Sequence, residues 1–538
     1  MKQTNEQRRG RRGSTRIIVV LLVGLCALSC LALVWAQNRD ALFQRERPRR
    51  AGTAKLIAVK AGGDLQRAID TAQPGDIIEL QAGASFIGSF TLPVKSGDAY
   101  ITIQSSQLSS LPPAGQRVSP AHAALMPRIL SPGQGQSAIR ALPGSHHFRF
   151  VGIEFAPTDA AAFLYHVIAL GSVQSEQDTL AEVPHHFIFD RCYIHAYPTQ
   201  DLRRGIMLNS GETTIEGCYI SDFKSKGFDS QAIAGWNGTG PYHILNNYLE
   251  GAGENIIFGG SDPSIPNLVP SDIEVRGNQL SKQLGWRGVW TVKNLFELKN
   301  ARRVIVEGNV MEYNWGDAQG GEAILFTVRN QDGASPWSVV EDVSFVNNVV
   351  RHVGGGVNIL GRDYYHPSEQ TKRITVKNNL FEDVDGTKWN GKGEFVLINE
   401  RAADITFDHN TVRQTGGVLV AGEGPHTGFT FTNNIVSHNE YGIYGTGTGS
   451  GNQTLTTYFP KAVVRRNLIA GARADTYPSD NFYPPNIDEA GFVNARGGNY
   501  RLRAESKYRG RGTDGKDVGC DLDALDAALT PALRQLLK

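Results

Sequence analysis

The feature that most constrains the fold is a short motif that recurs ten times between residues 189 and 469. Each copy has an alternating β-type run, two polar or small residues, an Asn or Cys, any residue and an apolar one. The Asn or Cys positions are Cys192, Cys218, Asn247, Asn278, Asn309, Asn348, Asn379, Asn410, Asn434 and Asn467, spaced by 26, 29, 31, 31, 39, 31, 31, 24 and 33 residues. Repeats of about 20 to 50 residues indicate stacked units. A minimum of 24 residues with variable excess fits one coil of a β solenoid with loops inserted at its turns.

Each repeat also supplies a second β-rich stretch between successive motif positions. ENIIFGG (254–260), NLFELKN (294–300) and AILFTVRN (323–330) alternate apolar and variable residues, as strands with one buried face do. Strands stack about 4.8 Å apart, so a buried Asn can bond to backbone and to the Asn one coil further on. The repeated Asn residues are therefore interpreted as framework.

Composition and length agree with this arrangement. The chain has 60 Gly and 24 Pro beside 40% hydrophobic and 20% charged residues, which is typical of a turn-rich β protein. Solenoids grow along one axis, so 538 residues need not divide into several domains. We predict an all-β chain, a single-stranded right-handed parallel β-helix over residues 56–525. Cys192 and Cys218 share one slot in adjacent coils, as buried small residues or as a disulfide.

Both ends of such a solenoid expose unpaired strand edges that need a cover. Residues 64–73 place Leu65, Ala68, Ile69 and Ala72 on one helical face, which predicts an N-terminal capping helix. Thr530 followed by Pro531 is a suitable N-cap and first helical position. A short C-terminal capping helix is therefore expected within residues 526–538.

The N-terminus predicts export of the main body. Residues 1–16 are basic, and residues 17–36 are twenty uncharged, mostly apolar residues, about the length that crosses a ~30 Å hydrocarbon core. We expect a transmembrane signal anchor, with a cleaved signal peptide as the alternative because Val34 and Ala36 could precede a cleavage site. Residues 37–55 are a charged linker, and either alternative places the body outside the cytoplasm, periplasmic or extracellular, or secreted if the segment is cleaved.

The charge distribution argues against nucleic-acid binding. Net charge is +1, yet residues 1–50 hold eleven Lys/Arg and three Asp/Glu, so 43 basic and 50 acidic residues remain for the body. A nucleic-acid partner requires a clustered basic surface. No nucleic-acid partner is expected, and a solenoid capped at both ends is expected to be a monomer.

The opening GDLQRAIDTAQPGDIIEL, the Asn repeat and the closing GTDGKDVGCDLDAL resemble the pectate-lyase-like superfamily of right-handed β-helix proteins. The resemblance covers roughly residues 56–525 and implies the fold better than a function, because the superfamily holds lyases, hydrolases, epimerases, adhesins and tail spikes. The paired Asp and Gly-His-Gly of polygalacturonases and the Asp-Pro-His-Asp of alginate epimerases are missing. Segments 253–260 and 299–309 resemble the chondroitinase-B and alginate-lyase branch, where a glutamate-containing coil precedes a lysine-bearing one.

Basic residues follow several second strands at comparable places. Lys299, Arg329, Arg362 and Arg401 are accompanied by Glu254, Asp363 and Glu400. A cationic stripe with this step would suit an acidic polysaccharide, since Arg offers paired donors to a carboxylate. The alternative is that these side chains are solvated or paired with Asp363 and Glu400.

β-Elimination from a uronate needs its carboxylate neutralised and a base that removes the neighbouring proton. Lys299 is the first choice for the base and Arg329 for the neutralising charge. Trp290 and Trp315 lie in the coils with the longest insertions, where they could stack on sugars or fill the core. The sequence therefore favours a carbohydrate-active β-helix that binds, and as a lyase cleaves, an acidic polysaccharide, with a non-catalytic binding or scaffold protein as the alternative.

No metal or cofactor is required by the sequence. Asp514, Asp517, Asp521 and Asp523 could offer oxygens to calcium, but the EF-hand pattern is absent and exposed aspartates of a turn-rich coil are the simpler interpretation. The histidines His146, His147, His185, His186, His243, His352 and His409 lack the two-His helical spacing of a zinc hydrolase.

Overall fold

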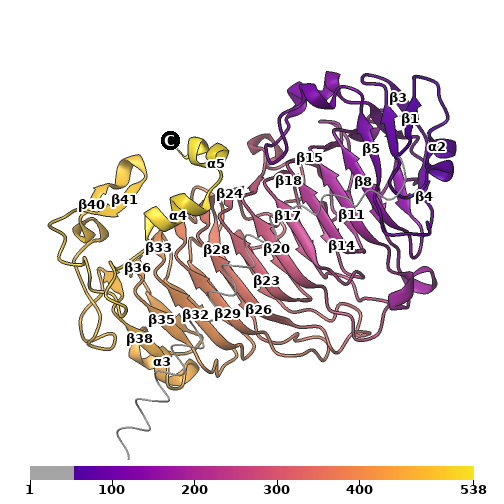
Figure 1. The fold of residues 1–538 in the computed structure, drawn as a ribbon. Helices are drawn as coiled ribbons and strands as arrows, with labels where there is room; N and C mark the ends of the chain where they lie inside the picture. The colour runs from indigo at the N-terminus through magenta and orange to yellow at the C-terminus, as the bar shows by residue number, and fades with distance from the viewer. Residues whose placement is uncertain (1–53, 538) are drawn as a thin grey trace, which may run out of the picture. The chain divides into compact units, whose positions relative to one another are not determined.

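Three long parallel sheets make up the folded body, which the computed structural model describes over residues 54–537 (Figure 1). From β2 to β39, successive strands join the three sheets in turn, so every third strand returns to the same sheet one coil further on. Strands connected in this way and paired in parallel form a parallel β-helix. The predicted fold is confirmed at this level, and its right-handedness stays a prediction.

The sheets are named A, B and C. Sheet A comprises β1 (Leu56–Val59), β2 (Ile77–Leu80), β5 (Ile101–Ser105), β8 (His146–Val151), β11 (His185–Asp190), β14 (Gly211–Glu216), β17 (Tyr242–Leu245), β20 (Ser271–Arg276), β23 (Ala301–Glu307), β26 (Val340–Val346), β29 (Lys372–Lys377), β32 (Ala403–Asp408), β35 (Thr430–Thr432) and β38 (Val463–Arg465). Sheet B comprises β3 (Ser85–Ile87), β6 (Arg128–Ser131), β9 (Glu154–Pro157), β12 (Tyr193–His195), β15 (Tyr219–Phe223), β18 (Tyr248–Gly251), β21 (Gln279–Ser281), β24 (Val310–Asn314), β27 (Val349–Val353), β30 (Leu380–Val384), β33 (Thr411–Gln414), β36 (Ile435–Ser437) and β39 (Leu468–Ala470). Sheet C comprises β4 (Phe90–Leu92), β7 (Ile139–Ala141), β10 (His166–Leu170), β13 (Arg204–Leu208), β16 (Gln231–Gly235), β19 (Glu254–Phe258), β22 (Asn294–Leu298), β25 (Glu322–Thr327), β28 (Gly355–Leu360), β31 (Val396–Asn399), β34 (Leu419–Ala421) and β37 (Ile443–Gly445).

The remaining elements are short. An antiparallel pair, β40 (Phe492–Asn494) and β41 (Asn499–Leu502), follows the last coil. The α-helices are α2 (Leu65–Thr71), α3 (Asn452–Tyr458), α4 (Leu522–Ala528) and α5 (Pro531–Leu536), and the 3-10 helices are η1 (Leu108–Ser110), η2 (Pro120–Leu125), η3 (Gln174–Glu176), η4 (Leu180–Glu182), η5 (Leu284–Trp286), η6 (Ile487–Ala490) and η7 (Ala495–Gly497).

One apolar core runs through the coils from Val59 to Tyr477. Equivalent residues stack in register, as Ile273 does on Val304 and Val304 on Val343. Each such side chain is nearly or fully buried, and full burial of an aliphatic side chain contributes about 1.5–3 kcal/mol. The core therefore lengthens coil by coil without needing a second layer.

The predicted Asn ladder is confirmed between sheets A and B. The side-chain oxygen of Asn278 accepts from the backbone N–H of Asn247 at 2.8 Å and from its amide Nδ2 at 3.0 Å. The same Nδ2 donates to the Ile215 carbonyl at 2.8 Å. This arrangement repeats through Asn467 and extends to Asn481, which the sequence spacing did not indicate.

The two cysteines occupy the first ladder positions as free, buried thiols. The Cys192 backbone N–H donates to the Cys218 sulfur at 3.3 Å, and the Cys218 N–H donates to the Asn247 side chain at 2.8 Å. The stacked-residue alternative is therefore the observed one. Burial raises the pKa of the Cys218 thiol well above its usual value, which keeps it unreactive.

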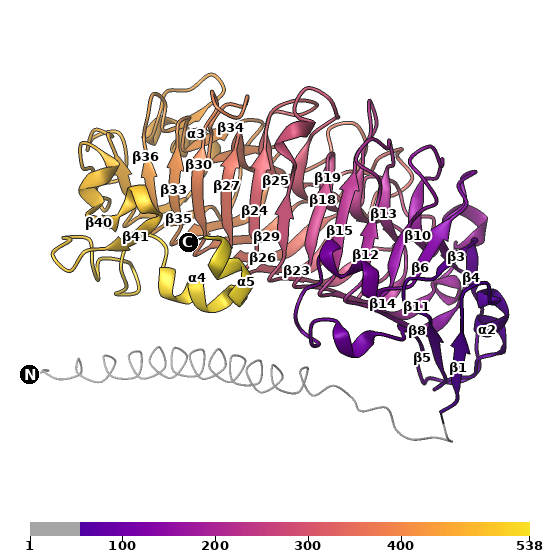
Figure 2. The ribbon, with the colours of Figure 1, turned by 90° about the horizontal axis from the view of Figure 1, so that it is seen from above.

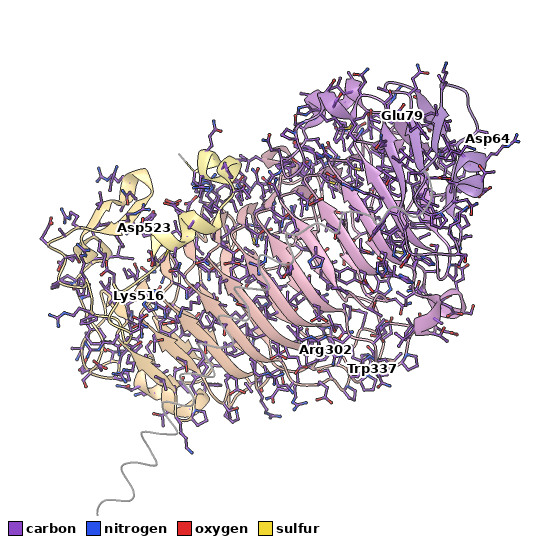
Figure 3. The ribbon with its side chains drawn as sticks, viewed as in Figure 1. Asp64, Glu79, Arg302, Trp337, Lys516 and Asp523 are labelled. Atoms are coloured by element: carbon purple, nitrogen blue, oxygen red, sulfur yellow. The ribbon has the colours of Figure 1, made fainter. Side chains whose placement is uncertain are left out.

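The N-terminal cap is confirmed. Helix α2 begins after Asp64, whose carboxylate accepts from the Arg67 N–H at 2.9 Å, and buries Leu65, Ala68 and Ile69. Figure 3 labels Asp64 beside this helix. At the other end, Leu455 of α3 and Phe459 join the continuous core and cover the last coil.

The C-terminal helix forms but does not close the end of the solenoid. Thr530 caps α5 as expected, yet α4 and α5 lie along sheet B, beside β24 (Figures 1 and 2). Leu522, Leu525, Leu529 and Leu533 pack there on Val310, Val349, Leu380, Ile435 and Leu468. The physical reason is that sheet B carries this apolar stripe, which would otherwise face solvent.

The predicted signal or anchor segment, residues 17–36, lies outside the described residues. Within residues 54–537, no helix is both long and apolar enough to span a bilayer.

Candidate functional site

A cavity of about 390 Å³ opens where strands of sheet C end, lined by Lys299, Arg329, Gln331, Tyr365 and His366. Lys299 follows β22, Arg329 follows β25, and the two aromatic residues lie in the loop after β28. Three consecutive coils therefore contribute to one cavity. The structure brings together the two residues that the sequence analysis assigned to catalysis.

Lys299 is held close to a carboxylate. Its Nζ lies 3.5 Å from Oε1 of Glu297, which is 1% exposed, and its backbone carbonyl accepts from the Arg329 N–H at 2.9 Å. The backbone bond fixes the spacing of the two cations across adjacent coils. Lys299 is thereby positioned both by Glu297 and by its backbone bond to the next coil.

Arg329 is fixed in orientation by three neighbours. Its Nη1 donates to Oδ1 of the buried Asp363 at 2.7 Å, and its guanidinium lies 4.7 Å from the Tyr364 ring centre and 5.3 Å from that of Tyr365. Burial alone would lower the pKa of Arg329, but the Tyr364 hydrogen bond and the Asp363 charge raise it above the ordinary value. The arginine is a permanent, pre-oriented cation.

Asp363 also organises the loop that carries the aromatic residues. Its carboxylate accepts from the backbone N–H groups of Asn330 and Tyr365, both at 2.9 Å. The same side chain therefore positions Arg329 and the start of the loop. Asp363 acts through Arg329 and does not line the cavity.

The segment that follows Arg329 is anchored by Asp262. Its carboxylate accepts from the backbone N–H groups of Gln331, Asp332 and Ala334 at 2.7 to 3.0 Å and from the Ser335 hydroxyl at 2.7 Å. Charge-assisted bonds of this kind are stronger than neutral ones. Gln331 is thereby fixed at the cavity wall.

A buried polar group lies on sheet C beside Glu297. Glu254 pairs in register with Asn294, and the Asn294 amide donates to Glu297 at 2.9 Å. Burial, with the Glu297 and Asp229 charges, raises the pKa of Glu254 to about 7. Lys293 partly compensates these acids, because its Nζ lies 2.5 Å from Asp229 and 3.6 Å from Glu254. Glu254 was predicted to bind substrate, but it is fully buried in this group and does not line the cavity.

Lys282 is a buried lysine that the sequence analysis did not identify. Its Nζ donates to the Gly251 carbonyl at 2.6 Å, the Gly253 carbonyl at 3.1 Å and the Asn255 side chain at 3.1 Å. Burial lowers the pKa of Lys282 to about 7. Its sequence context, an isolated Lys after a short strand, gives no signal of burial.

The predicted cationic stripe is interrupted. Arg362 is exposed and donates to the Ser368 carbonyl at 3.1 Å, and Arg401 donates to the Gly424 carbonyl at 3.3 Å. Neither they nor the half-buried Glu400 line the cavity. An equivalent position after a strand of sheet C is therefore not sufficient to bring an arginine into the cavity, because the loop that follows each strand has its own course.

The two tryptophans belong to an apolar cluster. Trp315 is 1% exposed and packs with Trp286, Val292 and Trp389. With no open ring face, Trp315 cannot stack on a sugar, so the core-packing alternative describes it. Trp290 is half-buried at the edge of this cluster, with the Lys224 and Lys226 ammonium groups 5.5 and 5.1 Å from its ring centre.

The C-terminal aspartates are engaged with protein groups. Asp521 caps α4, Asp523 pairs with Arg501 at 2.7 Å, Asp517 accepts from the Gly510 N–H, and Asp514 accepts from the Lys516 N–H. Figure 3 labels Asp523 on α4. These contacts match the interpretation as residues of a turn-rich coil.

The sequence analysis missed Gln331, Tyr365 and His366 as cavity residues. A signal existed, since Tyr364, Tyr365 and His366 follow Asp363 directly, and a run of aromatic residues in a loop favours a binding surface. What the spacing could not show is that this loop turns back towards the preceding coils.

Solved structures resemble this chain in fold. A PL6 family alginate lyase, AlyGC, has a TM-score of 0.50 and 13% identity over 87% of this chain and 58% of its own chain. The catalytic unit of a GH87 α-1,3-glucanase from Streptomyces thermodiastaticus has a TM-score of 0.46 and 12% identity over 83% of this chain and 72% of its own. A PL6 family polysaccharide lyase from Pseudopedobacter saltans has a TM-score of 0.41 and 11% identity over 86% of this chain and 99% of its own.

The likeness to AlyGC shows a parallel β-helix. This chain spans less than two thirds of AlyGC's length. No protein-family model and no curated protein sequence matches the chain. The expected resemblance to the pectate-lyase-like β-helix proteins is thus confirmed for the fold, and the structural neighbours include polysaccharide lyases, a glycoside hydrolase, a tailspike protein and a surface adhesin.

Proposed function

We propose that this protein binds a uronate-containing polysaccharide at the Lys299–Arg329 cavity and cleaves it by β-elimination. The observation that carries the proposal is the position of Lys299 and Arg329, from consecutive coils, beside Tyr365 and His366 in one cavity. Export of the body, with residues 17–36 as a membrane anchor, is part of the proposal. The alginate-lyase activity in the name of AlyGC belongs to the same reaction class.

Each cavity residue has a chemical role in this reaction. The bonds to Asp363 and Tyr364 use two of the five N–H donors of Arg329, and the others can bind the uronate carboxylate. Neutralising that carboxylate acidifies the adjacent C5–H, whose proton passes to the Lys299 amine as the C5 electrons form the C4=C5 bond. The C4–O bond breaks and the leaving oxygen takes a proton from Tyr365 or His366.

The test uses the full-length chain in mild detergent with polymannuronate, polyguluronate, polygalacturonate and a neutral glucan. Ultraviolet absorbance of the new C4=C5 bond and release of reducing ends are followed together. We expect both signals on a uronan, with Lys299→Ala and Arg329→Ala each lowering the rate by about 10²- to 10⁴-fold. Arg362→Ala is the matched control, because this exposed arginine lies outside the cavity.

Other results would contradict the proposal in separate ways. Reducing ends without absorbance would mean hydrolysis, and saturable binding of a uronan without product would mean a binding protein. Equal losses in Arg362→Ala and Arg329→Ala would show that general cationic charge, and not the cavity, matters.

A further inference from the structure

Four histidines that lie far apart in the sequence meet on sheet A. His146 and His147 begin β8, and His185 and His186 begin β11, with His185 directly paired to His146. The imidazoles of His146 and His185 stack at 5.0 Å, and those of His147 and His186 at 4.2 Å. Parallel register therefore turns two dipeptides 39 residues apart into a two-by-two array of rings.

Within each dipeptide the ring nitrogens face each other. Nδ1 of His185 lies 2.5 Å from Nδ1 of His186, and the equivalent distance between His146 and His147 is 2.8 Å. A nitrogen of each of His147, His185 and His186 lies within 4.8 Å of one from each of the other two. Two facing imidazole nitrogens must share either a proton or a metal ion.

Glu212 decides which nitrogen of His186 is free. This residue follows on the next strand, β14, and its Oε2 lies 2.6 Å from Nε2 of His186. The carboxylate therefore accepts a hydrogen bond from the Nε2–H of His186, and this tautomer leaves the lone pair of Nδ1 directed towards His185. A histidine that donates its second N–H to a carboxylate is the usual support of a metal ligand.

We propose that His147, His185 and His186 form a binding site for a divalent transition metal such as Zn²⁺, with Glu212 orienting His186 and water completing the coordination. Imidazole nitrogen suits Zn²⁺, Ni²⁺ and Cu²⁺. Zn–N bonds are about 2.0–2.1 Å, so two nitrogens on one tetrahedral ion lie about 3.3 Å apart. The 2.5 Å pair needs to open by under about 1 Å to admit it.

This site is separate from the proposed catalytic cavity. The histidines lie on sheet A in the coils of β8 and β11, whereas Lys299 and Arg329 follow β22 and β25 of sheet C. The metal would link two coils, and its binding to the folded state alone would raise the melting temperature. No step of the proposed elimination depends on it.

The experiment titrates Zn²⁺ into the full-length chain, without a polyhistidine tag and stripped with a chelator. Bound zinc is measured by equilibrium dialysis, and Co²⁺ in its place reports tetrahedral coordination by visible absorption. We expect one equivalent per chain and a higher melting temperature. Glu212→Gln should weaken binding by roughly 10- to 100-fold.

Two ligand variants and one control make the result specific. His185→Ala and His186→Asn should each abolish the cobalt spectrum, and Asn suits the left-handed backbone of position 186, where φ is 58°. His243→Ala is the control, since His243 lies on sheet A beside a carboxylate, Glu274, at 3.2 Å but has no second histidine. Zinc below one equivalent in the wild type, or equal loss in His243→Ala, would overturn the proposal. Metal-free melting curves that match the wild type exclude misfolding as the cause.

Discussion

At the scale of single residues, Glu254 predicts a pH-dependent contribution to stability. Its pKa is raised from 4.5 to about 7 by burial and by Glu297 and Asp229. The folded state therefore binds this proton more tightly than the unfolded chain, so the stabilisation is present below about pH 4.5 and is lost as the pH rises to about 7.

Glu254→Gln removes this titration while keeping the shape of the side chain. Relative to wild type, we expect the variant to gain stability between pH 5 and pH 8 by on the order of 2 kcal/mol. Thermal melting across this range measures the difference. Glu382→Gln is the control, because Glu382 of β30 on sheet B is a carboxyl that accepts from the Tyr500 hydroxyl of β41. A constant difference between Glu254→Gln and wild type at every pH would contradict the raised pKa.

Residue identity alone predicted part of the site. Lys299 and Arg329 could be aligned because both follow the ends of regular strands, and strand ends are what periodicity reveals. The sequence left open whether Trp315 stacks on sugars or fills the core and offered Glu254 as a substrate-binding residue, and burial of both side chains shows only once the coils are stacked. The histidine array escaped notice for a related reason: it exists only once the 39-residue register between β8 and β11 is known.

At the scale of the repeated turn, the Asn ladder makes a quantitative prediction. Asn348 accepts from the N–H and Nδ2 of Asn309 at 3.0 and 2.9 Å and donates to the Val306 carbonyl at 2.9 Å. Asn348→Ala leaves these buried groups unpaired, and each orphaned group costs about 1–3 kcal/mol. We expect a loss of about 3 kcal/mol or more, seen as a lower midpoint of urea unfolding.

Asn358→Ala is the matched control for the ladder. Asn358 is a half-exposed Asn of β28, in the adjoining strand of the same coil region. We expect its unfolding midpoint to stay close to wild type, since surface substitutions rarely exceed about 0.5 kcal/mol. Similar midpoints for both variants would mean that the ladder adds no stability.

The ladder also shows how far sequence reasoning reaches for an element. Ten positions were predicted from spacing, eight of them Asn, because a buried side-chain amide can satisfy both backbone and side-chain partners in the adjoining coils. Asn481 was missed, since it lies only 14 residues after Asn467 and outside the strand pattern. The C-terminal helix was predicted from its cap, whereas its place on sheet B depended on which apolar residues remained exposed.

At the scale of the whole described body, α4 and α5 cover an apolar stripe on one side of the solenoid. Leu525 and Leu533 pack on the apolar stripe of sheet B. The double variant Leu525→Asp, Leu533→Asp should detach both helices and expose that stripe, since a buried unpaired charge is strongly unfavourable. We expect larger species by size-exclusion chromatography with light scattering.

Ala532→Asp with Gln535→Asp supplies the same added charge at exposed positions of α5. This control should elute like the wild-type protein. If the leucine variant also elutes unchanged, the helices do not protect the stripe.

The continuous register of the three sheets has an evolutionary consequence. Each strand of the three sheets pairs only with strands of the coils before and after it, while the spacing between ladder positions ranges from 24 to 39 residues without breaking the pairing. A gene could therefore gain or lose a whole coil by unequal recombination and still encode a sound protein, provided that the junction falls at equivalent ladder positions. An in-frame duplication between two ladder positions would lengthen the solenoid by one coil and leave the strand pairing of the other coils intact.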